Sequence, residues 1–259
     1  MADPFMRAWD AADPKGAVAL VHGMAEHSGR YDYVGSALAA AGYSVRAVDI
    51  RGHGSAEGWP GQVAGAADWH EDTEAALRAA GAGAPGAPLF LMGHSLGSVI
   101  AASYVAKHSP AIAGLVLTGY AGLPGTALLA AMGNPDEPSI PVSAISRDPE
   151  IVKAYEDDPL VFFREVPVET NAAAMEAAIG ANQGAGSITM PVLMAHGTED
   201  QICDIEGARD FHAALGSDDK ELLVYDGLYH EVLNEPERDT VIADVVAWLD
   251  RHVAGGSGG

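Results

Sequence analysis

The sequence predicts an α/β fold with a mostly parallel central sheet and helices on both of its faces. Three observations favour this class. Strand-like and helix-like patterns alternate along most of the 259 residues, as is typical of parallel sheets. A Gly-x-Ser-x-Gly motif separates an apolar strand from a helix of small residues. Acidic and histidine residues follow two later strands, at the edge where open α/β sheets place their functional groups.

The first half of the chain supplies the elements before this motif. The uncharged run at 17–21 predicts a strand, a helix at 31–41 follows, and 43–49 is the next strand. Residues 68–80 predict a helix, because apolar side chains recur on one face and charged ones on the other. The N-terminal segment leaves room for one strand, near residues 6–9. We therefore do not expect a sheet of eight strands.

The most informative turn is the motif at 93–97, which reads Gly-His-Ser-Leu-Gly. It follows the apolar strand at 89–92 and precedes a predicted helix at 98–108. A serine at such a turn has strained backbone geometry and presents its hydroxyl above the sheet edge. Small glycines on either side let the strand and the helix approach closely. Ser95 is therefore a candidate nucleophile.

A serine hydroxyl needs a base to take its proton, and the base needs a carboxylate to orient it. Residues 190–197 predict a buried strand, and Asp200 follows its carboxyl end. Residues 221–225 predict the next strand, and His230 lies in the loop after it. We interpret Asp200 as the acid and His230 as the base. The chain order Ser, Asp, His is that of the α/β-hydrolase arrangement.

Other residues compete for these roles. Glu199 and Asp204 neighbour Asp200, but a carboxylate at 204 suits the start of the helix predicted at 205–215. No acid follows the strand predicted at 114–118, which closes that alternative. Three other histidines are less suited to the role of base. His94 occupies the variable position of the motif at 93–97, His212 lies within the helix predicted at 205–215, and His252 lies near the tail, after the helix predicted at 238–251.

The developing oxyanion of an acyl-transfer reaction needs two hydrogen-bond donors. In this arrangement one donor is the amide after the nucleophile, here that of Leu96, and the other lies in the loop after an early strand. The loop after residue 21 reads His-Gly-Met-Ala-Glu. Met24 is our candidate for the second amide.

Four motifs together resemble the monoacylglycerol lipase and lysophospholipase branch of the α/β-hydrolases. They are HGMAEHSGRY at 22–31, DIRGHG at 49–54, GHSLG at 93–97 and HGTED at 196–200. The first is the most specific to this branch, whereas the second and third occur in many esterases. The likeness extends over residues 16–253 but is thin between 120 and 187.

Carried over position by position, the resemblance implies a catalytic triad of Ser95, Asp200 and His230, with oxyanion amides at Met24 and Leu96. The function it implies is that of a serine carboxylester hydrolase that cleaves monoacylglycerol into fatty acid and glycerol. A lysophospholipid or a small ester could instead be the substrate of the same triad. A third reading, from another class, is a non-catalytic ligand receptor.

Prolines interrupt the alternation between residues 121 and 186, where we expect a helical cap inserted after the sixth strand. The hydrolase core then comprises 1–120 and 187–254, and 255–259 reads as a linker added for expression. Apolar residues here could line an acyl pocket or only pack the cap onto the core. Our candidates for substrate binding are Tyr120, Leu128, Met132, Ile145, Phe162, Met175, Ile179 and Leu233.

Cys203 lies three residues after Asp200, so we expect a thiol near the site that does not belong to it. A helix N-terminus lowers a thiol pKa, while Asp204 and Glu206 raise it. We expect moderate reactivity, against the alternative of an inert packing residue. The resemblance implies a cysteine at the same place.

Composition narrows the partners. A net charge of −22, from 14 Lys and Arg against 36 Asp and Glu, disfavours nucleic acid and anionic bilayers. A single cysteine excludes an internal disulfide. We see no signal peptide, transmembrane segment, cofactor motif or metal-ligand spacing, and expect a cytoplasmic enzyme with a small acyl ester substrate. The sequence does not determine the oligomeric state.

Overall fold

The computed structural model describes residues 4–122 and 139–254. Within them, seven strands form one sheet in the order β1-β3-β2-β4-β5-β6-β7. β1 is antiparallel to β3, and every other neighbouring pair is parallel. The strands are β1 (Met6–Trp9), β2 (Gly16–Val21), β3 (Tyr43–Val48), β4 (Leu89–His94), β5 (Gly114–Thr118), β6 (Val192–Gly197) and β7 (Lys220–Tyr225).

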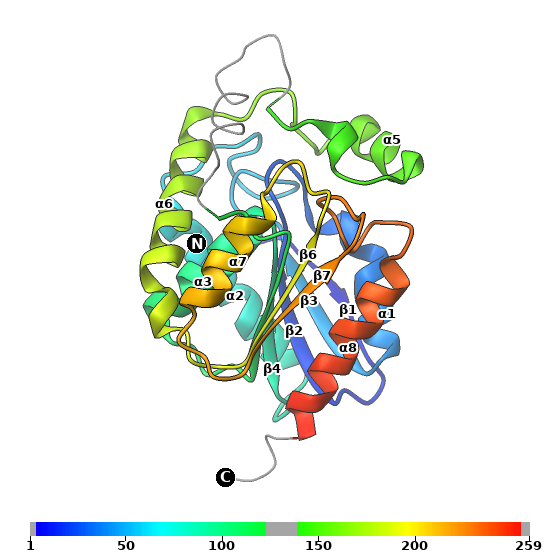
Figure 1. Cartoon of the computed structure of the whole chain (residues 1–259), viewed down its shortest axis with the longest axis vertical. Helices are drawn as coiled ribbons and strands as arrows, with labels where there is room; N and C mark the ends of the chain where they lie inside the picture. The colour runs from blue at the N-terminus through cyan, green and yellow to red at the C-terminus, as the bar shows by residue number, and fades with distance from the viewer. Residues whose placement is uncertain (1–3, 123–138, 255–259) are drawn as a thin grey trace.

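Helices cover both faces of this sheet (Figure 1). One face carries α1 (Asp32–Ala40) and α8 (Arg238–Ala254), whereas the other carries α2 (Ala66–Gly83), α3 (Leu96–His108) and α7 (Ile205–Ala214). The predicted fold class is confirmed. The described residues also contain three short 3-10 helices: η1 (Ser28–Tyr31), η2 (Val142–Ala144) and η3 (Ala185–Ser187).

The position of β2 in the sheet explains why residues 17–21 are an uninterrupted apolar run. Its side chains alternate between two separate cores, because successive residues of a strand point to opposite faces. Ala17, Ala19 and Val21 belong to the core under α2 and α3, while Val18 and Leu20 belong to the core under α1 and α8. A strand buried on both faces has no polar position, as in other parallel sheets.

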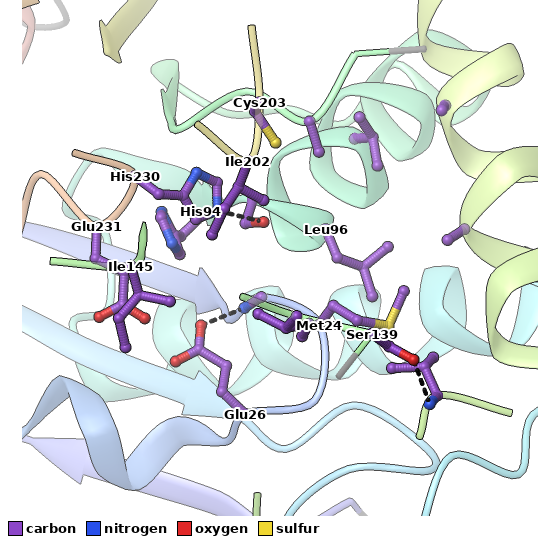
Figure 2. Close-up of a pocket in the computed structure, with 18 of the residues that line it drawn as sticks. Met24, Glu26, His94, Leu96, Ser139, Ile145, Ile202, Cys203, His230 and Glu231 are labelled. Atoms are coloured by element: carbon purple, nitrogen blue, oxygen red, sulfur yellow. Dashed lines mark hydrogen bonds between the residues drawn. The ribbon is translucent and has the colours of Figure 1, made fainter. Parts of the chain in front are cut away.

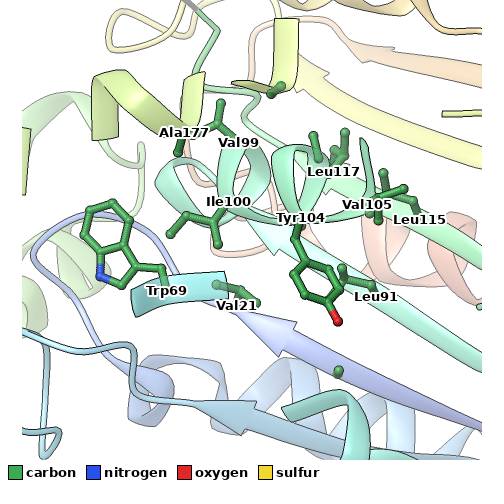
Figure 3. Packing of buried hydrophobic residues seen from close by; sticks show 14 of the residues in the cluster. Val21, Trp69, Leu91, Val99, Ile100, Tyr104, Val105, Leu115, Leu117 and Ala177 are labelled. Carbon is green, nitrogen blue, oxygen red and sulfur yellow. The ribbon is translucent and has the colours of Figure 1, made fainter. Parts of the chain in front are cut away.

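The core under α2 and α3 is the larger of the two and supports the Gly-x-Ser-x-Gly turn at 93–97, called the elbow below (Figure 3). Val99, Ile100 and Val105 of α3 pack there with Leu91 of β4 and Trp69 of α2, all almost completely buried. This packing fixes the first turn of α3 relative to the carboxyl end of β4. The turn between these two elements is therefore held rigidly from below.

The segment predicted as a cap follows β5, the fifth strand of the described residues, and not a sixth strand. The count differs by one because residues 4–15 contribute a single strand. The described part of the segment contains α5 (Pro149–Asp157) and α6 (Val168–Gly184), and α6 packs along α3. Whether 121–186 is a separate cap domain stays a prediction.

A small apolar cluster joins η2 to α5, through Val142, Ile145, Tyr155 and Phe163. Figure 1 shows α5 beyond the carboxyl ends of the strands, so this cluster lies on the side of the sheet where β4, β6 and β7 end. Among residues 4–122 and 139–254, no helix is long and apolar enough to cross a membrane.

Candidate active site

Ser95 occupies the turn between β4 and α3, with backbone angles of φ 51° and ψ −120°. A non-glycine residue rarely adopts a positive φ, and such strain is often found at functional sites. The Ser95 amide donates to the Thr118 carbonyl at the end of β5, at 2.9 Å. A Cβ atom on Gly97 would lie 2.1 Å from the Val21 carbonyl oxygen, so only glycine permits this approach of α3 to β2.

The structure brings Ser95, His230 and Asp200 into one hydrogen-bonded chain. His230 Nε2 lies 2.8 Å from Ser95 Oγ, and His230 Nδ1 lies 2.8 Å from Asp200 Oδ2. The carboxylate can only accept, so Nδ1 carries the ring proton and Nε2 is free to accept the serine proton. The side chain of Asp200 is fully buried and that of His230 is 5% exposed.

The pKa values of His230 and Asp200 shift in opposite directions. Burial opposes the charge of His230, but the Asp200 carboxylate outweighs it and raises the pKa of the ring above its ordinary value. Burial also opposes the charge of Asp200, yet His230 and His196 lower the pKa of this carboxyl far below its usual range. Asp200 therefore stays ionised and can stabilise an imidazolium at position 230.

The turn after β6 holds the Asp200 carboxylate in place. Asp200 Oδ1 accepts from the amides of Ile202 and Cys203, at 2.9 and 2.8 Å. Charge-assisted bonds of this type are stronger than neutral ones. The carboxylate is thus oriented by its own loop before it meets His230.

The loop after β2 passes close to the nucleophile. A Cβ atom on Gly23 would lie 3.2 Å from Cβ of Ser95, and Ala25 has a φ of 62°. The Gly23 amide donates to Glu26 at 2.6 Å, which orients the loop. Both Met24 and Leu96 line the cavity at Ser95, and within the described ranges no loop or side-chain acceptor is bonded to either amide.

A cavity with an empty volume of about 940 Å³, including its opening to solvent, lies above Ser95. Most of its wall is apolar among the described residues. This part includes Leu96 and Val99 of α3, Met175 and Ala178 of α6, and Ile140 before η2. A wall of aliphatic and thioether groups suits a flexible alkyl chain, because it makes no directional demands.

The cavity also has a polar end that the sequence analysis did not identify. Figure 2 shows Glu26 and Glu231 on the same side of the site, next to Ile145. Arg30 joins the two carboxylates, with bonds of 2.6 Å to each and a second bond of 2.7 Å to Glu231. The signal was available, since Glu26 and Arg30 lie in the first motif and Glu231 follows His230.

This polar end carries more negative than positive charge. Burial opposes ionisation of Glu26, but the Arg30 guanidinium outweighs it and lowers the pKa of Glu26 to about 2. His94 lines the cavity here, and burial lowers its pKa to about 4, so it is neutral near pH 7. Two carboxylates thus share one guanidinium at the wall of the cavity.

Two of the predicted substrate-binding residues lie in the cavity wall, namely Ile145 and Met175. Ile145 is buried beside the polar end, and its carbonyl accepts from the Glu231 amide at 2.8 Å. Leu128 and Met132 lie outside the described residues.

Four other predicted substrate-binding residues are not in the described cavity wall; three of them pack within the fold and one is exposed. The Tyr120 ring stacks on Phe211 in the core, and Leu233 is buried in the core under α1 and α8. Phe162 packs on a buried histidine ring, and Ile179 is 41% exposed to solvent. Apolar residues near a cavity commonly pack against the core instead of lining the cavity. The path of the backbone decides which side chains point into the cavity.

Cys203 lines the cavity but is 7% exposed. Burial, and after it the Asp200 carboxylate, raises the pKa of this thiol well above its ordinary value. From the sequence, Asp204 and Glu206 oppose the helix N-terminus and predict moderate reactivity. Burial and Asp200 dominate instead, which favours a protonated and less reactive thiol. Residues 4–122 and 139–254 contain no cluster of three or more side chains that could hold a metal ion.

A nucleophile elbow whose serine meets His and Asp from two later strand ends defines a serine hydrolase of the α/β-hydrolase class. The chain belongs to the serine aminopeptidase S33 family, whose sequence profile matches residues 12–237.

Named relatives align over nearly the whole chain. It is 36% identical over 252 residues to the monoacylglycerol lipase of Mycolicibacterium smegmatis, covering 93% of this chain and 90% of that one. It is 30% identical to the human monoglyceride lipase, covering 96% and 88%. The crystal structure of Paleococcus ferrophilus monoacylglycerol lipase superposes with a TM-score of 0.82 at 28% identity, covering 97% and 100%.

Proposed function

We propose that this protein is a serine ester hydrolase that cleaves monoacylglycerol into fatty acid and glycerol. The observation that carries the proposal is the Ser95–His230–Asp200 chain, which opens into a cavity with a mostly apolar wall and a polar end at Glu26 and Glu231. The named relatives, which are monoacylglycerol and monoglyceride lipases, support the same substrate.

The first half of the reaction forms an acyl-enzyme. Ser95 Oγ attacks the ester carbonyl carbon while His230 Nε2 takes the hydroxyl proton. The carbonyl electrons move onto its oxygen, where the amides of Met24 and Leu96 donate to the oxyanion. The tetrahedral intermediate collapses, the ester C–O bond breaks, and His230 gives its proton to the leaving glycerol oxygen.

The second half uses water in place of the serine. His230 takes a proton from water, the hydroxide attacks the acyl carbon, and Ser95 Oγ leaves with the proton that His230 returns. The fatty acid is released and the free enzyme is regenerated. Asp200 stays ionised throughout and stabilises the imidazolium, as its low pKa requires.

The two ends of the cavity favour the two ends of a monoacylglycerol. The alkyl chain fits the wall formed by α3 and α6, and the glycerol hydroxyls can donate to Glu26 and Glu231. A phosphate head group would instead meet these carboxylates, and Arg30, the cation bonded to them among the described residues, is already paired to both. We therefore infer that neutral glycerol esters are preferred to lysophospholipids.

A substrate panel tests the proposal. We expect kcat/KM for a monoacylglycerol to exceed that for lysophosphatidylcholine with the same acyl chain, and the Ser95→Ala variant to release no glycerol. Turnover that favours lysophosphatidylcholine would contradict the substrate, and turnover of p-nitrophenyl esters alone would indicate a small-ester hydrolase. Absence of any turnover or serine labelling would revive the receptor reading. The cytoplasmic location and the lack of a nucleic-acid partner stay predictions.

A further inference from the structure

A second histidine reaches the triad acid. His196 lies near the end of β6, four residues before Asp200, and is 1% exposed. Its Nε2 lies 3.1 Å from Asp200 Oδ2 and 2.9 Å from the Cys203 carbonyl oxygen. A carbonyl can only accept, so Nε2 carries a proton and donates it to the Cys203 carbonyl, with the Asp200 carboxylate oxygen beside the same N–H.

This contact is the fourth around one carboxylate. Oδ1 accepts from the amides of Ile202 and Cys203, Oδ2 accepts from His230 Nδ1, and His196 Nε2 lies 3.1 Å from the same Oδ2. The two histidines approach the same oxygen from different elements, because His196 belongs to β6 and His230 follows β7. Together with the amides, the four contacts leave the carboxylate little freedom to rotate.

The other ring nitrogen shows that His196 does more than fill space. His196 Nδ1 is buried and has no hydrogen-bond partner among the described residues. An unpartnered buried nitrogen is unfavourable, and an apolar side chain of the same volume would avoid it. The imidazole is therefore explained by what Nε2 does.

We propose that His196 is a positioning residue for the triad: its Nε2–H directs Asp200 Oδ2 toward His230 and ties the Cys203 carbonyl to the same point, closing the turn at 200–203. The inference rests on the proposed function, since orienting Asp200 matters only if Ser95 is the nucleophile. It assigns His196 no contact with substrate. Its effect passes through Asp200 and through the cavity wall at Ile202 and Cys203.

Two amide variants separate the nitrogens. In His196→Gln the side-chain NH₂ can occupy the place of Nε2, whereas in His196→Asn it matches Nδ1 and leaves Asp200 without this donor. We expect His196→Gln to keep kcat within about threefold, and His196→Asn to lower it about tenfold or more, as loss of a bond to a charged group does. A p-nitrophenyl ester and the rate of Ser95 labelling by a fluorophosphonate are the readouts.

The pH profile of kcat/KM distinguishes positioning from general destabilisation. Groups that face His230 are Asp200, Glu231, Glu26 and His94, and of these only Asp200 touches residue 196. Without this donor Oδ2 is no longer directed at His230, and the imidazolium loses part of its stabilisation. The acidic limb of the profile, which reports the pKa of His230, should move to lower pH in His196→Asn and stay in place in His196→Gln.

A matched control is His70→Asn, which removes another buried imidazole, one bonded to Ser103 and outside the site. It should lower Tm without moving the acidic limb. The inference would be overturned if His196→Asn kept the wild-type kcat and the wild-type acidic limb. Equal losses of kcat in His196→Asn and His196→Gln would also overturn it. Failure of the proposed function looks different, because the wild-type protein would then neither hydrolyse an ester nor be labelled at Ser95.

Discussion

At Ser95, local backbone strain and long-range contacts together hold the hydroxyl in position for His230. The positive φ is sustained because the Ser95 amide bonds to the end of β5 and Gly97 packs directly on β2. His230 then needs no rearrangement to reach the hydroxyl, at 2.8 Å. Preorganisation of this type lowers the cost of reaching the transition state.

The first prediction concerns the triad. Ser95→Ala and His230→Ala should each lower kcat by about four orders of magnitude or more, and Asp200→Asn by somewhat less, because triad members act as a unit. Steady-state ester hydrolysis measures the loss, with circular dichroism as the check on folding. Substantial activity in Ser95→Ala would remove the serine from the mechanism.

The second prediction concerns Cys203. Because its pKa is raised and the thiol is buried, a bulky maleimide should react slowly at pH 7, faster at alkaline pH, and inhibit by obstructing the cavity. Cys203→Ala should keep most of the wild-type kcat and be resistant to the reagent. Mass spectrometry with residual activity measures both. A large loss of turnover in a folded Cys203→Ala variant would show that the thiol has a role of its own.

At the scale of elements, the site depends on four loops or turns, which follow β2, β4, β6 and β7 and meet at the carboxyl ends of these strands. One close approach is that of α3 to β2 at Gly97, where the turn that carries Ser95 meets the strand that leads to the Met24 loop. Any displacement there separates the nucleophile from the proposed oxyanion donors. The geometry of the elbow and that of the oxyanion loop are therefore coupled.

The third prediction tests this coupling. Gly97→Ala should lower the free energy of unfolding by about 1–3 kcal/mol or more, since its Cβ would overlap the Val21 carbonyl. It should also lower kcat. The matched control is Gly207→Ala in α7, where a Cβ meets no atom within 4 Å and better helix propensity should add about 0.5–1 kcal/mol to the free energy of unfolding. Denaturant unfolding and kcat are measured on both variants. A Gly97→Ala protein as stable and as active as wild type would contradict the packing argument.

The sequence predicted the elements of the sheet better than the wall of the cavity. Strand ends carry local signals, such as the motif at Ser95, and the parallel order then brings distant strand ends to one edge. The placement of Tyr120 and Leu233 depended on which face of a loop turns inward, which no periodicity encodes. The contact of His196 with Asp200 was missed because it depends on the path of the turn after β6.

At the scale of the whole molecule, a net charge of −22 surrounds a cavity whose polar end is itself acidic. Both features act against anionic ligands, but over different distances. The surface charge is screened by salt within about 10 Å at 0.1 M, whereas Glu26 and Glu231 are buried and are screened less. Salt should therefore remove only part of the discrimination.

The fourth prediction follows from this difference. The ratio of kcat/KM for a monoacylglycerol to that for an anionic lysophosphatidylglycerol with the same acyl chain should fall as ionic strength rises, yet stay above one. Glu231→Gln should lower the ratio further, because it removes a carboxylate from the polar end. A ratio that does not respond to salt or to Glu231→Gln would show that charge does not select the head group.

The most direct test of the central claim is to look for the acyl group on Ser95. The protein is mixed with a monoacylglycerol, quenched in acid during turnover, digested and examined by mass spectrometry. We predict a peptide carrying the fatty acyl mass on Ser95, together with one equivalent of glycerol released for each acyl group transferred, and neither product with Ser95→Ala. Glycerol release by Ser95→Ala, or an acyl group on another residue, would contradict the account.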